Sequence, residues 1–253
     1  MEFHSTTRRN FLRHTSVVCG GLALPAVAVA VEQTFASEGA QPQDQAPEDK
    51  AEGKHKPKGA EEISPAEDLM REHGVLNRIL LIYDEHLHLL AAKKPFDGSV
   101  LTAAADIVRH FVEDYHEKLE EDFLFPRFRK AGKWVPLVKT LQKQHAAGRD
   151  LTAQIRELAA TATFKLVSDS DKLAEALRAF IRMYRPHEAR EDTVLFPAFR
   201  SVVSPHEYDA LGEDFEKKED DLFGEDGFFK IVDQVAQLEK RLGIYDISQF
   251  TPK

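Results

Sequence analysis

The chain has 253 residues, of which 42% are hydrophobic, so it can bury one sizeable core but not several large ones. We therefore expect one main domain with appendages. Its 34 Lys and Arg are outnumbered by 43 Asp and Glu, which gives a formal net charge of −9. This balance provides no basic surface of the kind that neutralises phosphates, so nucleic acid is not an expected partner.

Residues 1–30 have the pattern of an export address rather than of a folded element. Arg8 and Arg9, followed by Asn-Phe-Leu, precede an uncharged apolar run with small residues at Ala28 and Ala30. The pattern resembles a twin-arginine signal peptide cleaved after Ala30. We therefore expect a periplasmic or otherwise exported protein that engages the twin-arginine export machinery. An uncleaved membrane anchor is the alternative, disfavoured because the run is shorter than the ~20 residues of a membrane span.

The mature chain would begin with a segment that is too polar to fold. Residues 31–63 consist largely of Gln, Pro, Glu, Lys, Gly and Ala, and we expect a disordered linker there. Cys19, the only cysteine, belongs to the predicted signal peptide. The mature chain would therefore have neither a disulfide nor a thiolate ligand for a metal.

Residues 64–203 predict four helices with short connections. A capping box at Ser64 starts the first helix. Apolar residues recur at spacings of three and four in four stretches, at about 64–92, 98–126, 135–160 and 168–197. Pro126 and Pro197 are expected to end the second and fourth helices, and Pro186 is expected to kink the fourth. This pattern predicts an all-α fold, an antiparallel up-down four-helix bundle.

Residues 204–253 are expected to form a C-terminal helical extension. A second capping box at Ser204 starts one helix, and Gly243 ends another that begins near Phe228. Packing on the bundle and packing on a second subunit are both compatible with this pattern.

Four histidines occupy matching depths in the predicted bundle: His73, His116, His145 and His187. The first and third lie nine residues after Ser64 and Pro136, and the other two lie ten residues before the terminal prolines. Antiparallel helices place starts beside ends, so at ~1.5 Å per residue all four imidazoles lie at one level, roughly 14 Å from the same end. Glu120 and Glu191 follow two of them by one turn and face the same way.

Two similar segments contain two of the four histidines and both glutamates. HEKLEEDFLFP starts at residue 116 and HEAREDTVLFP starts at residue 187, and the other two histidines are separated by a similar 72 residues. The chain is therefore predicted to be a duplicated helix pair, with each copy supplying half of a site. Four imidazoles and two carboxylates are costly to bury alone, and a pair of metal ions is the usual compensation. The Leu-Phe-Pro ends are expected only to pack and to stop the helices.

These segments, together with Glu-His at 72–73 and Gln-His at 144–145, resemble a haemerythrin-like, HHE cation-binding domain over about residues 64–203. Such domains are non-haem di-iron four-helix bundles, so the resemblance implies two iron ions joined by an oxo or hydroxo bridge. It implies the metal ligands His73, His116, His145 and His187, with Glu120 as a bridging carboxylate. Manganese and zinc remain alternatives, because histidine and carboxylate suit all three metals.

The second bridging carboxylate has two candidates. Oxygen-carrying haemerythrins place an Asp five residues after the last histidine and other members place a Glu four after it, whereas this chain has both, Asp192 and Glu191. Symmetry with Glu120 favours Glu191. Glu117 and Glu188 directly follow their histidines, about 100° round the helix. We expect these two to be solvated, with metal ligation by one of them as the alternative.

One position departs from the oxygen carriers. They have a second histidine four residues after the third ligand, where this chain has Arg149. This arginine either points inward, where it would stabilise a bound anion, or turns outward and pairs with an acid. Tyr184 either lines the site or is a core tyrosine with a satisfied hydroxyl. Three other histidines are expected to face away from the site or to lie too far along their helix: His86, His88 and His110.

Three functions fit these features. The resemblance implies an exported di-iron protein that binds or reduces oxygen, peroxide or nitric oxide. The alternatives are an iron-binding protein that stores or senses iron without turnover, and an interaction module stabilised by structural zinc or manganese. Because Arg149 stands where the carriers have their second histidine, one iron would have an open position, which favours reaction over oxygen storage.

Overall fold

The computed structural model describes residues 63–160 and 167–252, and every regular element in this part of the chain is helical. The predicted all-α class is confirmed for the described residues. The expected signal peptide and nearly all of the expected linker lie outside the described residues. Among the helices described, none combines the length and the apolar character that crossing a membrane requires.

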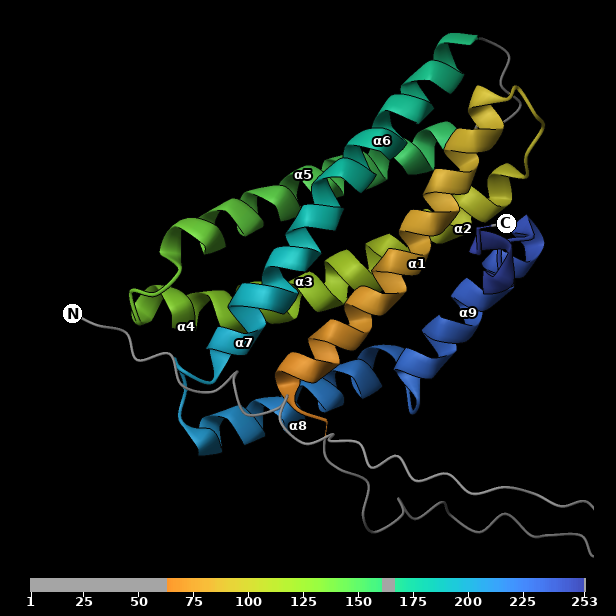
Figure 1. The fold of residues 1–253 in the computed structure, drawn as a ribbon. Helices are drawn as coiled ribbons and strands as arrows, with labels where there is room; N and C mark the ends of the chain where they lie inside the picture. Colours follow the sequence, from red (N-terminus) through yellow and green to blue (C-terminus); the bar gives the residue numbers. More distant parts are fainter. Residues whose placement is uncertain (1–62, 161–166, 253) are drawn as a thin grey trace, which may run out of the picture. The chain divides into compact units, whose positions relative to one another are not determined.

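Four long helical columns form the first part of the fold (Figure 1). The first is α1 (Pro65–Ala91) and the third is α5 (Val135–Ala160). The second column is continuous and consists of α2 (Gly98–Ile107), the π-helical η1 (Val108–His116), α3 (Glu117–Leu119), the π-helical η2 (Glu120–Leu124) and α4 (Phe125–Lys130). The fourth consists of α6 (Val167–Arg190), the π-helical η3 (Glu191–Leu195) and α7 (Phe196–Phe199).

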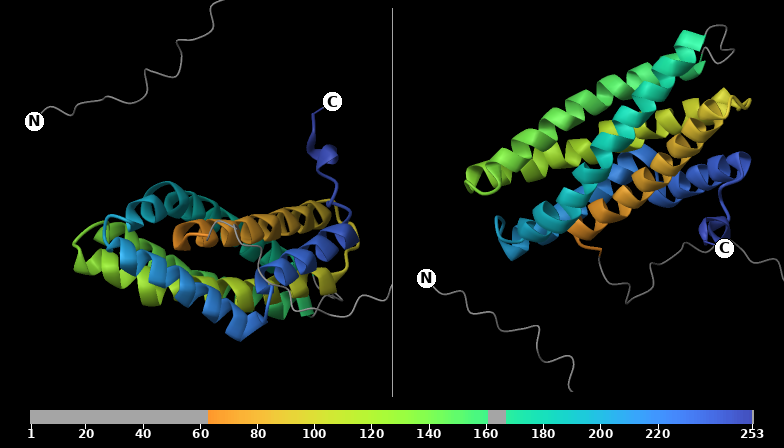
Figure 2. Two further views of the ribbon diagram at one scale, coloured as in Figure 1. Left: turned by 90° about the horizontal axis from the view of Figure 1, so that it is seen from below. Right: turned by 45° about the horizontal axis from the view of Figure 1, so that its top comes forward.

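Consecutive columns run in opposite directions and enclose one core (Figure 1). α5 packs against both α6 and α2, and α1 packs against α6 and η1. Two further helices, α8 (Pro205–Phe223) and α9 (Gly227–Leu242), lie on the side of α1 away from α6 (Figure 2). A 3-10 turn at Ile247–Phe250 follows. The C-terminal extension therefore packs on its own chain.

The predicted helix starts agree closely with the structure. The Ser64 hydroxyl accepts a hydrogen bond from the N–H of Glu67 at 3.3 Å, and the Ser204 hydroxyl accepts one from the N–H of Glu207 at 3.2 Å. Gly243 ends α9 with a φ of 78°, a left-handed conformation that costs glycine little. Both serine N-caps and the glycine stop are confirmed.

The expectation that Pro126 and Pro197 stop their helices is wrong, because both prolines lie inside continuous columns, just after a π turn. The fourth column nevertheless ends near Pro197, at Phe199, as expected. In each case the N–H of the preceding phenylalanine bonds a carbonyl five residues back, Phe125 to Glu120 and Phe196 to Glu191. The wide turn shifts the hydrogen-bond register just before a residue that has no N–H and would clash within a regular α-helix. Pro186 likewise lies within α6, which continues to Arg190.

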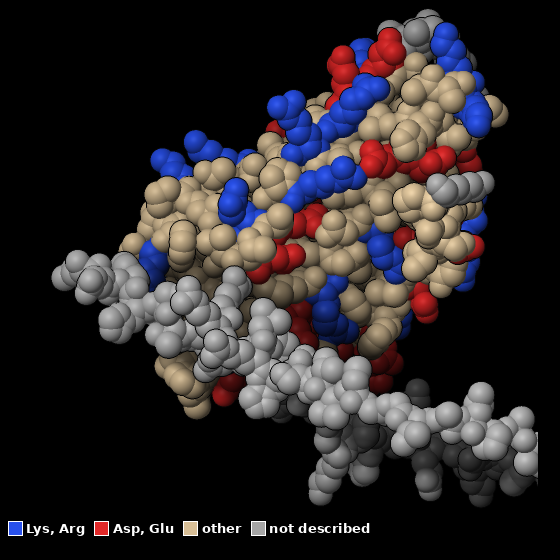
Figure 3. Space-filling view, in the orientation of Figure 1, with Lys and Arg blue, Asp and Glu red and all other residues tan. Residues whose placement is uncertain are grey.

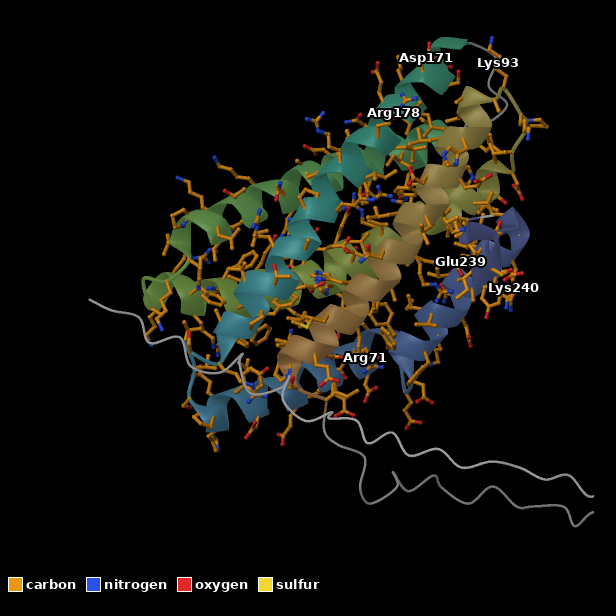
Figure 4. The ribbon with its side chains drawn as sticks, in the orientation of Figure 1. Arg71, Lys93, Asp171, Arg178, Glu239 and Lys240 are labelled. Atoms are coloured by element: carbon orange, nitrogen blue, oxygen red, sulfur yellow. The ribbon has the colours of Figure 1, made fainter. Side chains whose placement is uncertain are left out.

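Ion pairs fasten α9 to the first two columns. Arg78 of α1 donates from Nε at 2.9 Å and from Nη2 at 2.5 Å to the carboxylate of Glu239, which is buried. Figure 4 labels Glu239 on the α9 helix. Arg241 donates to Asp97, the cap of α2, at 2.6 Å. On the face shown in Figure 3, acidic and basic side chains are interspersed rather than separated.

His86 of α1 is a buried core histidine, away from the other four. Its Nδ1 lies 2.7 Å from the carbonyl oxygen of Ile82, and its ring packs edge-on against Phe96. Nε2 is buried without a hydrogen-bond partner. Burial lowers the pKa of His86, so the folded chain holds this ring in its neutral form.

We expect His86 to make the fold less stable in acid. Below the ordinary histidine pKa of about 6.5, His86 binds a proton in the unfolded chain but not in the folded chain. The free energy of unfolding therefore falls as the pH drops. Urea unfolding at about pH 7.5 and about pH 5.5 should show a smaller loss in His86→Leu than in the wild type, by at most about 1.4 kcal/mol per pH unit. Equal losses in the two proteins would contradict this.

Candidate metal centre

The four predicted histidines converge in the interior of the columns, each with at most 4% of its surface exposed. The Nε2 atoms of His73 and His116 lie 3.1 Å apart. Glu120 and Glu191 reach between the rings from the π turns η2 and η3, and both are fully buried. The closest approaches to their Oε2 atoms are 3.3 Å from His145 to Glu120, 3.1 Å from His187 to Glu191 and 3.4 Å from His73 to Glu191.

Each histidine is held at its outer nitrogen by a side chain from another column. The Nδ1 distances are 2.7 Å from His73 to Asp192, 2.6 Å from His116 to Glu72, 3.1 Å from His145 to Glu121 and 3.0 Å from His187 to Gln144. An Nδ1–H that donates outward leaves the lone pair of Nε2 facing inward. In that tautomer each of the four rings would present an inward nitrogen acceptor, as metal-binding histidines do.

These anchors follow the internal duplication of the chain. The residue before the histidine in the first and third columns, Glu72 or Gln144, anchors the histidine of the next column. The residue after the buried glutamate, Glu121 or Asp192, anchors a histidine of the other helix pair. Sequence reasoning used the Glu-His and Gln-His pairs only as part of the family pattern. Their equal positions in the two copies were the available signal for the anchoring role.

The aromatic residue of each Leu-Phe-Pro segment forms a wall of the site. Phe196 stacks on His73 at 5.3 Å between ring centroids, and Phe125 stacks on His145 at 5.5 Å. In an α-helix a residue five positions on lies about 140° round, whereas the wider π turn brings it back toward the face of the glutamate. The expectation that these segments only pack and stop helices missed this contact.

The inward atoms lack other partners. Both carboxylate oxygens of Glu120 and of Glu191, and Nε2 of His145, are buried without a hydrogen-bond partner. Groups of this kind are costly to bury unless they bind something. Two sets bring their ligand atoms within 4.8 Å of one another: Glu120, His145, His187 and Glu191, and His73, His116 and Glu120. Imidazole nitrogens and carboxylate oxygens suit iron, manganese or zinc, so the residues present fit a metal pair.

The two candidates for the second bridging carboxylate lie in different places. Glu191 is fully buried and faces the inward nitrogens of His73 and His187. The side chain of Asp192 is 33% exposed and bonds the outer nitrogen of His73. Glu191 therefore points into the site, and Asp192 anchors the outer nitrogen of His73.

The expectation that Glu117 and Glu188 are solvated is wrong, because they are only 1% and 3% exposed. Glu117 accepts a hydrogen bond from the Tyr184 hydroxyl at 2.8 Å, and Glu188 accepts one from the amide of Asn77. Both glutamates therefore face neighbouring columns, where donors on those columns offset part of the cost of burial. The hydroxyl of Tyr184 is satisfied, as one of the two alternatives for it expected.

Gly148 makes room for the Tyr184 side chain. A Cβ at residue 148 would lie 2.8 Å from the Cζ of Tyr184 and would also overlap its hydroxyl. Only glycine therefore lets α5 approach the ring closely enough for Tyr184 to reach Glu117.

Arg149 pairs with acids rather than offering a free cation. Its Nη2 lies 2.7 Å from Glu117 and 2.8 Å from Glu121. The second of these carboxylates also anchors His145 and pairs with Lys118 at 2.6 Å. Of the two alternatives for Arg149, the structure shows the pairing with acids.

Burial and neighbouring charges shift the pKa values of the histidines and carboxylates at the site. Burial lowers the pKa of His116 to about 4 and raises that of its anchor Glu72 to about 8. Burial alone would also lower the pKa of His145, but the neighbouring carboxylates of Glu120 and Glu121 outweigh this and raise it to about 10. Burial, followed by the repulsion of Glu191, raises the pKa of Glu120 above its ordinary range.

A further carboxylate group lies behind the anchor of His116. Asp68 and Glu72 of α1 and Glu219 of α8 approach one another within 4.8 Å. Burial, followed by repulsion from Glu72, raises the pKa of Asp68 to about 7. The C-terminal extension thus adds negative charge beside the residue that orients His116.

The comparisons with known proteins agree with this arrangement. Residues 64–199 match the family model described as "Hemerythrin HHE cation binding domain", and residues 136–226 match it again. The chain belongs to this family. The second match begins at α5, as expected for a chain built from a repeated helix pair.

The chain also resembles uncharacterised proteins of two mycobacteria. It is 50% identical over 192 residues to a protein of Mycobacterium bovis (strain ATCC BAA-935 / AF2122/97). The aligned region covers 75% of this chain and 74% of the relative. Proteins of Mycobacterium tuberculosis strains CDC 1551 / Oshkosh and ATCC 25618 / H37Rv show the same identity and coverage. No solved structure gives a significant match. Membership of the haemerythrin family and the His/Glu groups together indicate a metal-binding site.

Metal binding at this site should release protons and strengthen as the pH rises. A cation needs the lone pair of Nε2, so it must displace the proton that the raised pKa of His145 retains at neutral pH. The affinity of the chelator-treated chain for Zn²⁺ should increase about tenfold per pH unit between about pH 6 and about pH 8 for each proton displaced. Titration in weakly buffered solution would measure the released protons directly. Equal affinity across this range, without proton release, would contradict the expectation.

Proposed function

We propose that the first four columns form a haemerythrin four-helix bundle that holds two iron ions and binds or reduces small oxidants such as oxygen, peroxide or nitric oxide. The observation that carries the proposal is the set of four anchored histidines whose Nε2 atoms face two buried, unpartnered carboxylates. This donor set fits a di-metal carboxylate site in a helical bundle.

Each ion would be held by one histidine pair and the shared carboxylates. His73 and His116, with Glu120, form one set, and His145 and His187 form the other with Glu120 and Glu191. Glu120 belongs to both sets, and Glu191 also approaches His73. These two carboxylates are therefore our proposed bridges.

The chain's own residues favour reaction over reversible oxygen storage. Two ferrous ions would supply the two electrons that, with two protons, reduce one hydrogen peroxide to two water molecules. Arg149 occupies the position where the carriers have a histidine, and its guanidinium is held by Glu117 and Glu121. It adds no nitrogen to the site, so a small molecule can take that place. The rings of Phe125 and Phe196 cover the histidines and limit the entry of water.

We also propose that the protein acts outside the cytoplasm. The support is the twin-arginine pattern of residues 1–30. A route of this kind resembles one that carries proteins already folded, which suits a chain that must acquire its metal before export.

The isolated protein should contain about two iron ions per chain. His116→Ala and His187→Ala should each lose much of that iron, because each removes one nitrogen from one half of the site. His88→Ala is the matched control, since its ring is 75% exposed and lies away from the site. Elemental analysis with an optical spectrum measures both the amount and the kind of metal. Unchanged iron in the first two variants would reject the site, and stoichiometric zinc would favour a structural role.

The reduced, iron-loaded protein should oxidise rapidly in air and consume hydrogen peroxide, because Arg149 supplies no ligand and one coordination position would be open. Spectra recorded through repeated oxygenation and deoxygenation would test the first expectation, and a peroxide electrode the second. His187→Ala, treated in the same way, should be much slower. Full recovery of the reduced spectrum over repeated cycles would restore the oxygen-carrier interpretation.

A further inference from the structure

The two halves of the site differ in the charge of their histidine anchors. Three of the four outer nitrogens face a carboxylate, but His187 faces the neutral amide of Gln144 at 3.0 Å. Its counterpart in the duplicated chain is Glu72, which bonds His116 at 2.6 Å. The duplication therefore placed a carboxylate and an amide at equivalent positions.

The three carboxylate anchors also differ in whether a cation pairs with them. Glu121, which anchors His145, is also paired with Lys118 at 2.6 Å and with Arg149 at 2.8 Å. In the described part of the chain, neither Glu72 nor Asp192 has a Lys or Arg nitrogen within ion-pairing distance. Two cations thus offset the charge of the Glu121 anchor, whereas no Lys or Arg in the described part of the chain pairs with the other two carboxylate anchors.

These anchors divide between the two proposed metal positions. His73 and His116, whose Nε2 atoms lie 3.1 Å apart, rest on the two carboxylates that have no cation partner. His145 and His187 rest on one cation-paired carboxylate and one amide. An anionic acceptor makes an imidazole a stronger ligand than a neutral acceptor does, because it favours the charge that the ring transfers to a metal.

We propose that the duplicated site is unequal, with a tight cation position at His73 and His116 and a weaker, exchangeable one at His145 and His187, and that Gln144 sets the difference. The inference rests on the proposed two-metal site and deepens it. The weaker position is also the one beside Arg149, where the carrier histidine is replaced. Exchange of metal and access of small molecules would therefore occur in the same half of the site.

The test is a titration of the full chain with Co²⁺ in competition with a chelator, followed by the visible spectrum of the bound ion. The wild type should bind two ions in two separate steps. Gln144→Glu should strengthen the weaker step by about tenfold or more, and Glu72→Gln should weaken the tighter step by a similar factor. Gln142→Glu is the matched control, because it adds the same charge to α5 at an exposed position two residues away and should leave both steps unchanged.

Two variants of the ligands assign the steps. His187→Ala should remove the weaker step and leave the tighter one, whereas His116→Ala should do the reverse. Equal affinity for both ions in the wild type, or an unchanged weaker step in Gln144→Glu, would overturn the inference and leave the two-metal proposal standing. Failure of the wild type to bind Co²⁺ would reject both.

Discussion

The hydrogen bond at the outer nitrogen of each histidine is the constraint on which the site depends. A buried imidazole can point either nitrogen inward, and the anchor from a neighbouring column selects Nε2 in all four cases. Each bond also fixes the height of one column relative to another, since both partners must stay within about 3 Å. The same four contacts therefore orient the ligands and set the register of the bundle.

The π turns allow one column to direct three side chains to the same interior face, which the anchoring hydrogen bonds alone do not achieve. A single column must present a histidine, a glutamate one turn later and a phenylalanine five residues after the glutamate to the same interior. A regular α-helix cannot align all three, because its turn contains 3.6 residues. The turns at Glu120–Leu124 and Glu191–Leu195 bring the aromatic ring onto the histidine of the opposite pair and also accommodate the following proline. One local distortion thus serves both packing and the site, as π turns at functional sites commonly do.

The C-terminal extension packs against the elements that carry two of the histidines. Glu239 is buried in an ion pair with Arg78, five residues beyond the histidine of α1, and Glu219 lies against the carboxylates that precede that histidine. Aromatic contacts reinforce this, since Phe223 of α8 packs against Tyr115, the residue before His116. Changes in α8 can therefore reach His73 and His116 through contacts that are only one residue removed from them.

The sequence by itself determined the helical class, the helix starts and the depth of the six inward residues. Capping boxes, apolar periodicity and the repeated motif are local signals, and equal distances from helix ends translate directly into equal heights. The tertiary structure alone decided which way the neighbours of those residues point. Glu117 and Glu188 were expected in solvent on helix angle, but Tyr184, Arg149 and Asn77 of other columns provide partners for them inside. The angle round one helix does not say what stands opposite it, and burial of a carboxylate depends on whether a donor from another column reaches it.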